Sequence, residues 1–377
     1  MSTRHLLVTN DFPPKIGGIQ SYLWELWRRL DPERFVVLTT AHPDAAAFDP
    51  VQPFRIERVP ETQMLPTPSL RARVDRLAAE AGVDLAVLDP VLPLGLIGPR
   101  LSLPYAVVLH GAEVTVPGRL PVSSSLMAMV LRRAVRVIAA GGYPAAEARR
   151  VAAGRLPPVT IVAPGVDCDR FRPVDAGRRA AVRERFGIHA DAPLVVSVSR
   201  LVPRKGMDVL IEASARLAPR LPGLVVAIAG KGRDLGRLNG IVVRTGAPVR
   251  LLGEVPDADL ADLVGSADAF AMLCRNRWLG LEQEGFGIVF LEASACGVPV
   301  VAGASGGAAE AVEDGVTGVV LSRPEDPAGA ADALWSLLSD RARAAAMGAA
   351  GRQRAEAEFS YDRLATDLGE ALGEAGG

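Results

Sequence analysis

Short apolar runs rich in Val and Ile recur along the first half of the chain and are separated by longer amphipathic stretches. Continuous apolar runs of this length are typical of parallel strands that are buried on both faces of a sheet. The runs are Leu6–Thr9, Phe35–Thr40, Phe54–Val59, Leu85–Leu88, Tyr105–Leu109, Val135–Ala139 and Val159–Val162. Helices are predicted between them, among them Ile19–Leu30, Leu70–Ala81, Leu126–Arg133 and Pro144–Ala153.

The same alternation starts again in the second half. Its apolar runs are Leu194–Val198, Leu224–Ala229, Val249–Leu252, Ala269–Leu273, Val298–Ala302 and Val319–Leu321. The stretch from Asp326 to Leu372 is rich in Ala and Arg and predicts helices only. Two successive series of strands and helices predict an α/β protein with two doubly wound, Rossmann-like domains. The break is expected near the Pro-Gly-Val-Asp segment at 164–167, which gives domains at 1–166 and 167–359.

Composition narrows the class of protein. The chain has 42 Lys and Arg against 43 Asp and Glu, so a nucleic-acid partner held over the whole surface is not expected. The three cysteines are widely spaced and include no Cys-x-x-Cys pair, which favours a reduced cytoplasmic protein over a disulfide or zinc-based fold. The first apolar run is too short for a signal-peptide core. The stretch 85–103 contains charges and prolines, which argue against a membrane span.

Ligands of doubly wound folds bind beyond the carboxyl ends of the strands, so the loops there are the candidate sites. The first such loop contains Gly17 and Gly18 before a helix, which suits either a bound anion or a tight turn. The loop after the fifth run begins with His110. This imidazole could contact a substrate hydroxyl or transfer a proton, but a structural histidine is the alternative.

The loop that follows 194–198 is basic. Arg200, Arg204 and Lys205 precede a helix that is expected to begin near Gly206. Lysine occurs only three times in the chain, whereas arginine is abundant. An ammonium and a guanidinium group at a helix entrance suit a diphosphate, although a solvated basic turn is the alternative.

Glu284 and Glu292 flank a glycine-containing segment, Gly285-Phe286-Gly287. If the segment were wholly helical, the eight-residue separation would span ~12 Å, too far for the ~5 Å spacing of a retaining glycosidase pair. The glycines instead predict a helix that starts near residue 287, with Glu284 on the loop before it. Two carboxylates flanking bare helix amides fit a nucleotide sugar, with hydroxyls at both ends and a diphosphate between them. A buried helix with two incidental glutamates is the alternative.

Taken together, these residues resemble glycosyltransferase family four, the retaining enzymes of the GT-B fold. The Glu-x7-Glu signature of that family corresponds to Glu284 and Glu292, and its Ser-Arg-x4-Lys-Gly loop lies within 197–208. The paired glycines, the His110-Gly111 pair and the 164–171 crossover also fit. The resemblance implies two domains facing a cleft, metal-independent transfer with no cofactor, and a C-terminal helix, 360–377, that returns to the first domain.

The resemblance also implies a role for each site residue. Glu292 would hold the ribose of the donor and Val255 would contact the base through its backbone. Gly18, Arg200 and Lys205 would hold the diphosphate. Glu284 and the backbone of Phe286, Gly287 and Ile288 would hold the sugar, and His110 would contact it during transfer. The leaving diphosphate would act as base in a front-face attack.

Within the family, the sequence is most similar to the actinobacterial phosphatidylinositol mannosyltransferases, through 10–20 and Cys274-Arg275-Asn276-Arg277-Trp278. This likeness implies GDP-mannose as donor and a phosphatidylinositol monomannoside as glycolipid acceptor, joined by an α-1,6 linkage. Alternatives are a family-four enzyme with a UDP sugar or a soluble acceptor, a GT-B epimerase of sugar nucleotides, and a non-catalytic binding protein. The segment 279–283 departs from shorter members of the family and has no assigned role.

A lipid acceptor requires access to an anionic membrane surface from the cytoplasm. In the segment 69–78, Leu70, Val74 and Leu77 share one helical face. Three arginines, Arg71, Arg73 and Arg76, share the remaining face with Asp75. Basic side chains of this kind are attracted to anionic lipids. The sequence therefore predicts a peripheral protein on the inner face of the cell membrane. The alternative is a surface helix that packs on the sheet.

Overall fold

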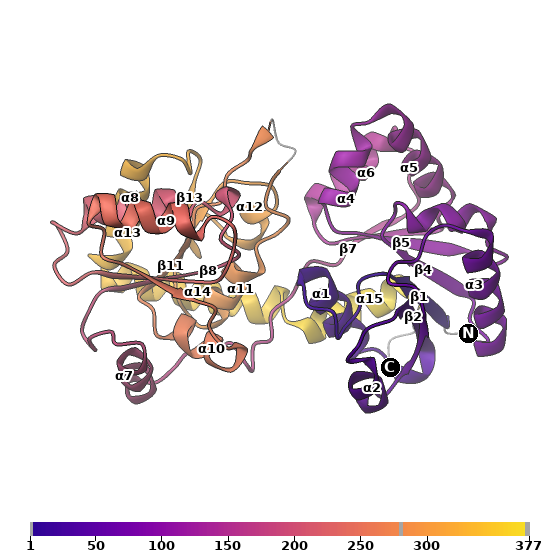
Figure 1. Cartoon of the computed structure of the whole chain (residues 1–377), viewed down its shortest axis with the longest axis horizontal. Coiled ribbons are helices and arrows are strands. Elements are labelled where there is room, and N and C mark those ends of the chain that lie inside the picture. Colours follow the sequence, from indigo (N-terminus) through magenta and orange to yellow (C-terminus); the bar gives the residue numbers. More distant parts are fainter. Residues whose placement is uncertain (1–2, 279–281, 374–377) are drawn as a thin grey trace. The chain divides into compact units, whose positions relative to one another are not determined.

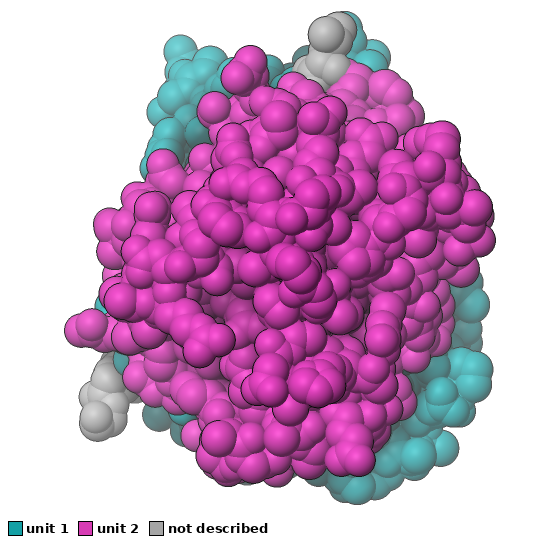
Figure 2. Space-filling model, turned by 90° about the vertical axis from the view of Figure 1, so that its left-hand side faces the viewer, with its two compact units in different colours: residues 1–164, 361–377 teal, residues 165–360 magenta. Residues whose placement is uncertain are grey.

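The structure is a computed structural model that describes residues 3–278 and 282–373 (Figure 1). It divides into two compact units (Figure 2): the first contains the residues up to 164 together with those from 361 onward, and the second contains 165–360. The sequence placed these boundaries after residue 166 and before residue 360, within two residues of the observed positions.

The first unit is built on a parallel sheet of order β3-β2-β1-β4-β5-β6-β7. Its strands are β1 (His5–Thr9), β2 (Phe35–Thr40), β3 (Arg55–Val59), β4 (Leu85–Asp89), β5 (Tyr105–Leu109), β6 (Arg136–Ala139) and β7 (Val159–Ile161). Each of the seven predicted runs therefore coincides with a strand to within one residue at either end. The order begins 3-2-1-4-5-6, that of a Rossmann fold, so the direction of winding reverses between β1 and β4.

Helices cover both faces of this sheet. They are α1 (Gly18–Trp27), α2 (Ala45–Phe48), α3 (Pro68–Ala81), α4 (Ala112–Gly118), α5 (Pro121–Arg133), α6 (Gly142–Val151) and α15 (Tyr361–Leu372). Side chains of α3, α5 and α6 pack with Leu6 and Val8 in one core cluster, whereas α1 and α15 pack with Leu7 in another. The predicted C-terminal helix thus supplies part of the core of the first unit.

The second unit contains a parallel sheet of order β10-β9-β8-β11-β12-β13, which is again the Rossmann order. The strands are β8 (Leu194–Val198), β9 (Val225–Ala229), β10 (Val249–Gly253), β11 (Ala269–Met272), β12 (Val300–Gly303) and β13 (Gly318–Leu321). The helices are α7 (Ala176–Arg185), α8 (Met207–Leu217), α9 (Leu235–Thr245), α10 (Asp257–Gly265), α11 (Ile288–Ala295), α12 (Ala308–Ala311), α13 (Pro327–Leu338) and α14 (Arg341–Glu358). The prediction of two doubly wound domains is confirmed.

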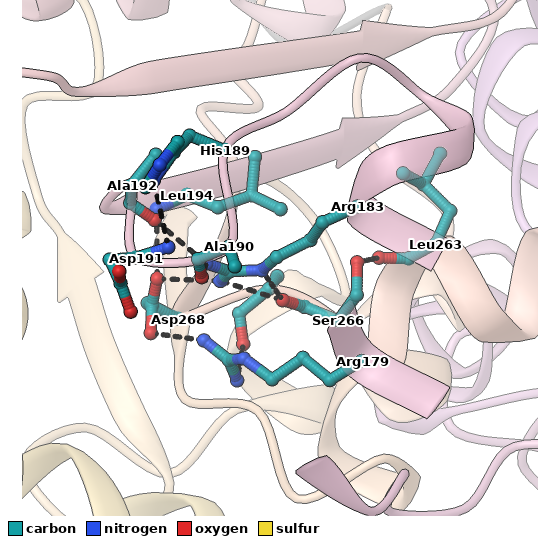
Figure 3. A network of polar contacts seen from close by, with 11 residues as sticks. Arg179, Arg183, His189, Ala190, Asp191, Ala192, Leu194, Leu263, Ser266 and Asp268 are labelled. Atoms are coloured by element: carbon teal, nitrogen blue, oxygen red, sulfur yellow. Dashed lines mark hydrogen bonds and ion pairs between the residues drawn. The ribbon is translucent and has the colours of Figure 1, made fainter. Parts of the chain in front are cut away.

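A buried arginine ties α7 to this second sheet (Figure 3). Arg183 is 2% exposed, and its guanidinium donates to the carbonyl oxygens of Ala190, Ala192 and Ser266 at 2.7–3.0 Å. It also pairs with Asp268 at 2.9 Å, whose carboxylate accepts the Leu194 amide. Because Leu194 and Asp268 stand at the amino ends of β8 and β11, this network lies at the edge of the sheet opposite to the candidate loops.

No helix among the described residues combines the length and the apolar character needed to cross a bilayer.

Candidate functional site

The loop between β8 and α8 carries the basic residues of the predicted anion site. Pro203–Lys205 form a turn of 3-10 helix, and Gly206 follows in a left-handed conformation with φ of 70°. A Cβ on Gly206 would stand 2.0 Å from the Leu273 carbonyl oxygen. Glycine is therefore required for this loop to pack against the end of β11. The Arg275 amide also donates to the Arg204 carbonyl at 2.9 Å.

Glu284 lies on the loop before α11, and the helix begins at Ile288, as the sequence predicted. The Glu284 amide donates to Ser305 Oγ at 3.1 Å, and its carbonyl accepts the Gly307 amide at 3.1 Å. A Cβ on Gly306 would come within 2.0 Å of the same carbonyl oxygen. The Ser-Gly-Gly loop after β12 therefore holds the backbone of Glu284. Sequence reasoning missed this loop, although its place directly after an apolar run was a signal.

The carboxylate of Glu284 is buried between two cations. Its Oε2 atom lies 2.7 Å from Lys205 Nζ and also pairs with the Arg204 guanidinium. The Cys274 thiol approaches the same oxygen at 3.6 Å. Burial alone would raise the pKa of Glu284, but the charges of Lys205 and Arg204 and their hydrogen bonds lower it. The site thus holds Glu284 ionised and oriented.

The resemblance assigned Lys205 and Arg200 to the donor diphosphate, and in the structure Lys205 and Arg204 both pair with Glu284. The Arg200 side chain is exposed, and no ion pair involves it within the described ranges 3–278 and 282–373. Arg204, which belongs to the predicted basic loop but was given no role of its own, is therefore the arginine of that loop that contacts Glu284. Only the fold could show which arginine of the loop turns towards a carboxylate about 80 positions away.

The first turn of α11 follows Glu284 directly. Phe286 is buried against Phe359, with ring centroids 5.8 Å apart, and Gly287 adopts φ of 84° as the N-cap. The first amides of a helix lack intrahelical acceptors. Gly287, Ile288 and the next residue thus present such amides beside the Glu284 loop, which is an arrangement suited to an anion.

Glu292 lies one turn further along α11 and is partly buried. Burial raises the pKa of its carboxyl group to about 7, with a smaller raising effect from Asp257 and an opposing effect from Arg170. Arg170 and Asp257 pair with each other at 2.7 Å. Val255 stands between β10 and α10, two residues before Asp257. Glu292 and Val255, the predicted contact to the nucleotide base, therefore belong to neighbouring elements of the second unit.

In the first unit, His110 directly follows β5 and is only 9% exposed. Its Nε2 atom lies 2.8 Å from Asp89 Oδ1, and its ring meets that of Tyr22 edge to face, with centroids 5.3 Å apart. Burial disfavours the charged ring, but Asp89, then Glu113 and Asp11, outweigh burial and raise the pKa of His110. Asp89 was missed by sequence reasoning, although a carboxylate that ends an apolar run was a visible signal.

Gly18 is exposed at the first position of α1, and a Cβ there would meet no atom within 4 Å. Gly17 is tighter, because a Cβ there would stand 2.2 Å from Gln20 Oε1. Gln20 donates to Asp11 at 2.6 Å, which in turn accepts from Lys15 at 2.9 Å. The loop is thus held by its own polar side chains while the backbone at Gly18 stays open.

The segment after β11 forms a short antiparallel bridge between Arg277 and Glu282, whose side chains pair at 2.9 Å. Trp278 is 62% exposed and has φ of 49°. The segment 279–283, for which no role was predicted, falls partly outside the description, because residues 279–281 are not among the described residues.

Comparison with known proteins identifies the relatives of this chain. The family model "Glycosyl transferases group 1" matches residues 178–354. A "GDP-mannose-dependent alpha-(1-6)-phosphatidylinositol monomannoside mannosyltransferase" from Mycobacterium tuberculosis is 41% identical, over 98% of each chain. A "GDP-mannose-dependent monoacylated alpha-(1-6)-phosphatidylinositol monomannoside mannosyltransferase" from Corynebacterium glutamicum is 36% identical, again over 98% of each.

Among solved structures, Anabaena HepE in complex with UDP is similar, with a TM-score of 0.82 and 23% identity over 98% of this chain and 99% of that one. At this identity the likeness supports the two-domain fold. The identity to the mannosyltransferases over nearly the full length goes further and confirms the resemblance read from the motifs. The chain belongs to the group 1 glycosyl transferases, in the same family as these phosphatidylinositol monomannoside mannosyltransferases.

Proposed function

We propose that this chain is a retaining mannosyltransferase that moves mannose from GDP-mannose to a phosphatidylinositol monomannoside and forms an α-1,6 linkage. The observation that carries the proposal is the 41% identity to a protein named for this activity, over 98% of both chains. The buried cluster of Glu284, Lys205 and Arg204 beside the start of α11 supports it, because a sugar diphosphate needs both hydroxyl acceptors and cations.

In the proposed complex, Glu292 accepts hydrogen bonds from the ribose and the Val255 backbone contacts the base. Lys205 and Arg200 neutralise the diphosphate, and the backbone at Gly18 approaches it. Glu284 and the amides of Phe286, Gly287 and Ile288 position the mannose, and His110 contacts it during transfer. The leaving diphosphate accepts the proton of the attacking hydroxyl. Protein cations and helix amides stabilise the charge that develops on it, so the proposal includes no metal ion or cofactor.

The proposal is tested by supplying GDP-mannose with phosphatidylinositol monomannoside in one reaction and with soluble inositol phosphate in another, followed by mass analysis. Parallel reactions contain UDP-glucose in place of GDP-mannose. A single added hexose on the lipid, seen with GDP-mannose alone, is the expected result. Transfer only from the UDP sugar, transfer only to the soluble acceptor, or epimerised donor without an acceptor would each overturn the proposal.

The raised pKa of Glu292 predicts that donor binding depends on pH. The ribose hydroxyls donate to the ionised carboxylate, so binding requires deprotonation of a group whose pKa is about 7 in the free protein. Below that pH the affinity for GDP-mannose should fall, by up to about tenfold per pH unit. Calorimetric titration from about pH 8 to about pH 6 measures this.

GDP-mannose is the suitable ligand for this titration, because each of its phosphates has one ester and one anhydride link, and its single remaining acidic oxygen stays ionised over the range. The control is Glu292→Gln, which cannot ionise and should bind more weakly with a flatter pH profile. An equally steep profile in this variant would assign the titration to another group, such as His110, whose pKa is also raised.

We further propose that the protein is peripheral on an anionic membrane at the cytoplasmic face, with α3 as a point of contact. Leu70, Val74 and Leu77 are buried in the core of the first unit, so the alternative of an apolar stripe packed on the sheet is confirmed. Arg71, Arg73 and Arg76 nevertheless remain exposed. Arg71 lies 3.9 Å from Asp75 on the same side of the helix, a loose and solvent-exposed pair. The charged side of the helix is thus accessible to lipid headgroups, whereas its apolar side is not.

Changing Arg71, Arg73 and Arg76 together to Ser should weaken binding to phosphatidylinositol liposomes by about two orders of magnitude at low salt, at ~1 kcal/mol for each charge. GDP affinity should stay the same. The matched control removes three exposed arginines of the second unit, Arg323, Arg341 and Arg343. Equal sedimentation of wild type and the α3 variant would remove this helix from the membrane contact.

A further inference from the structure

Three side chains form a hydrogen-bonded chain across the carboxyl edge of the first sheet. Thr9 ends β1, Asp89 ends β4 and His110 follows β5, and these three strands are neighbours in the sheet. Thr9 and Asp89 are partners in the strand register. Thr9 Oγ1 donates to Asp89 Oδ2 at 2.7 Å, and Asp89 Oδ1 lies 2.8 Å from His110 Nε2.

We propose that Asp89 is a positioning residue for His110: by binding Nε2, it fixes the imidazole ring and directs Nδ1 to the ligand. Asp89 is 1% exposed, and each of its carboxylate oxygens has one of these two partners. Such a carboxylate can neither rotate nor be replaced by water without breaking a buried hydrogen bond. This inference rests on the proposed function, which gives His110 a ligand to contact.

The chemistry of the ring supports this role. When the neutral ring donates from Nε2 to Asp89, Nδ1 carries the lone pair and can only accept. When the ring is protonated, Nδ1 becomes a second donor. In both states the partner at Nε2 determines what Nδ1 offers to a sugar hydroxyl, as in other sites where a carboxylate orients a histidine.

The electrostatic surroundings of His110 are acidic. Asp89 and Glu113 lie closest, Asp11 contributes from the β1–α1 loop, and the Tyr22 ring packs on the imidazole. The Glu113 carboxylate accepts the backbone amides of His110 and Gly111 and does not take the ring. Asp89 is therefore the one of these acids that hydrogen-bonds the imidazole itself.

The test is Asp89→Asn, which keeps the shape but removes the charge. The imidazole Cε1–H resonances of the four histidines are titrated by NMR without substrate, and the His110 signal is assigned by its loss in His110→Gln. We expect the pKa of His110 to be lower in Asp89→Asn than in the wild type, while the titration curves of the other histidines stay the same in the two proteins. Transfer to the lipid acceptor should drop at least about tenfold in kcat, with KM for GDP-mannose unchanged.

Thr9→Val is the second variant and serves if Asp89→Asn does not fold. It removes the hydroxyl that holds Oδ2 and should change the pKa of His110 and kcat in the same directions, but by less. An unchanged His110 titration in both variants, or a lowered pKa with full kcat, would overturn the positioning role. Since the titration needs no substrate, a failure of the proposed function would appear separately, as wild-type protein without transfer.

Discussion

Replacing Glu284 with glutamine is expected to reduce mannosyl transfer by about two to three orders of magnitude, the usual loss when one preorganised polar contact to the transition state is removed. GDP affinity should change little, because GDP lacks the hexose that this carboxylate is proposed to hold. Glutamine keeps the size of the side chain but not its charge. Lys205 and Arg204 would then lose their shared anion and remain available to the diphosphate.

Glu282 provides the matched control. It lies two residues away in the chain, and its side chain is 21% exposed and pairs with Arg277. Its carboxylate stays 4.0 Å from the Arg204 guanidinium, so it resembles Glu284 in type and position but makes only a distant contact with that cation. Glu282→Gln should therefore retain most of the activity. Turnover is measured with GDP-mannose and lipid acceptor, and GDP binding by calorimetry. If Glu284→Gln weakened GDP binding by the same factor as turnover, the carboxylate would serve the nucleotide and not the sugar.

Replacing Arg183 with methionine should lower the free energy of unfolding of the second unit by about 3–5 kcal/mol, because each buried acceptor left without its donor costs about 1–3 kcal/mol. The substitution leaves the carbonyl oxygens of Ala190, Ala192 and Ser266 without this donor. The Asp268 carboxylate loses one of its two arginine partners and keeps Arg179. Denaturant unfolding followed by far-UV circular dichroism measures the change.

The control comes from the same helix. Arg178 forms a two-pronged pair with Asp262 at 2.8 Å, but its side chain is 58% exposed. Arg178→Met should therefore change the stability much less, because solvent screens an exposed ion pair. Equal losses in the two variants would show that burial is not what makes Arg183 important.

The strands could be predicted from the sequence because the sheets are covered on both faces. Leu6, Leu7 and Val8 are all fully buried, although they point alternately to opposite sides. Such strands become continuous apolar runs that polar loops interrupt. Helix α7 was not predicted from the sequence. Only Val182 and Arg183 of its ten residues are buried, so the segment shows no apolar stripe and its pattern is typical of a polar linker.

The candidate site was predictable only in part. His110 follows β5 directly, and Lys205 and Glu284 lie on the segments that follow β8 and β11, so their positions along the chain placed them at the carboxyl edges of the two sheets. Pairing between side chains was not predictable, because the partners come from distant loops. Asp89 contacts a residue 21 positions away, and Arg204 one 80 positions away. Sequence spacing carries no information about which of several nearby charges turns inward.

The return of the chain to the first unit affects the order in which the protein is completed on the ribosome. Leu364 and Leu368 of α15 fill the same core cluster as Leu23 of α1, yet the whole segment 165–360 lies between them in the chain. All of the second unit emerges before them. Although domains generally fold in the order of their synthesis, here the unit that begins first acquires its full core last. Until then its α1 face remains exposed to other chains.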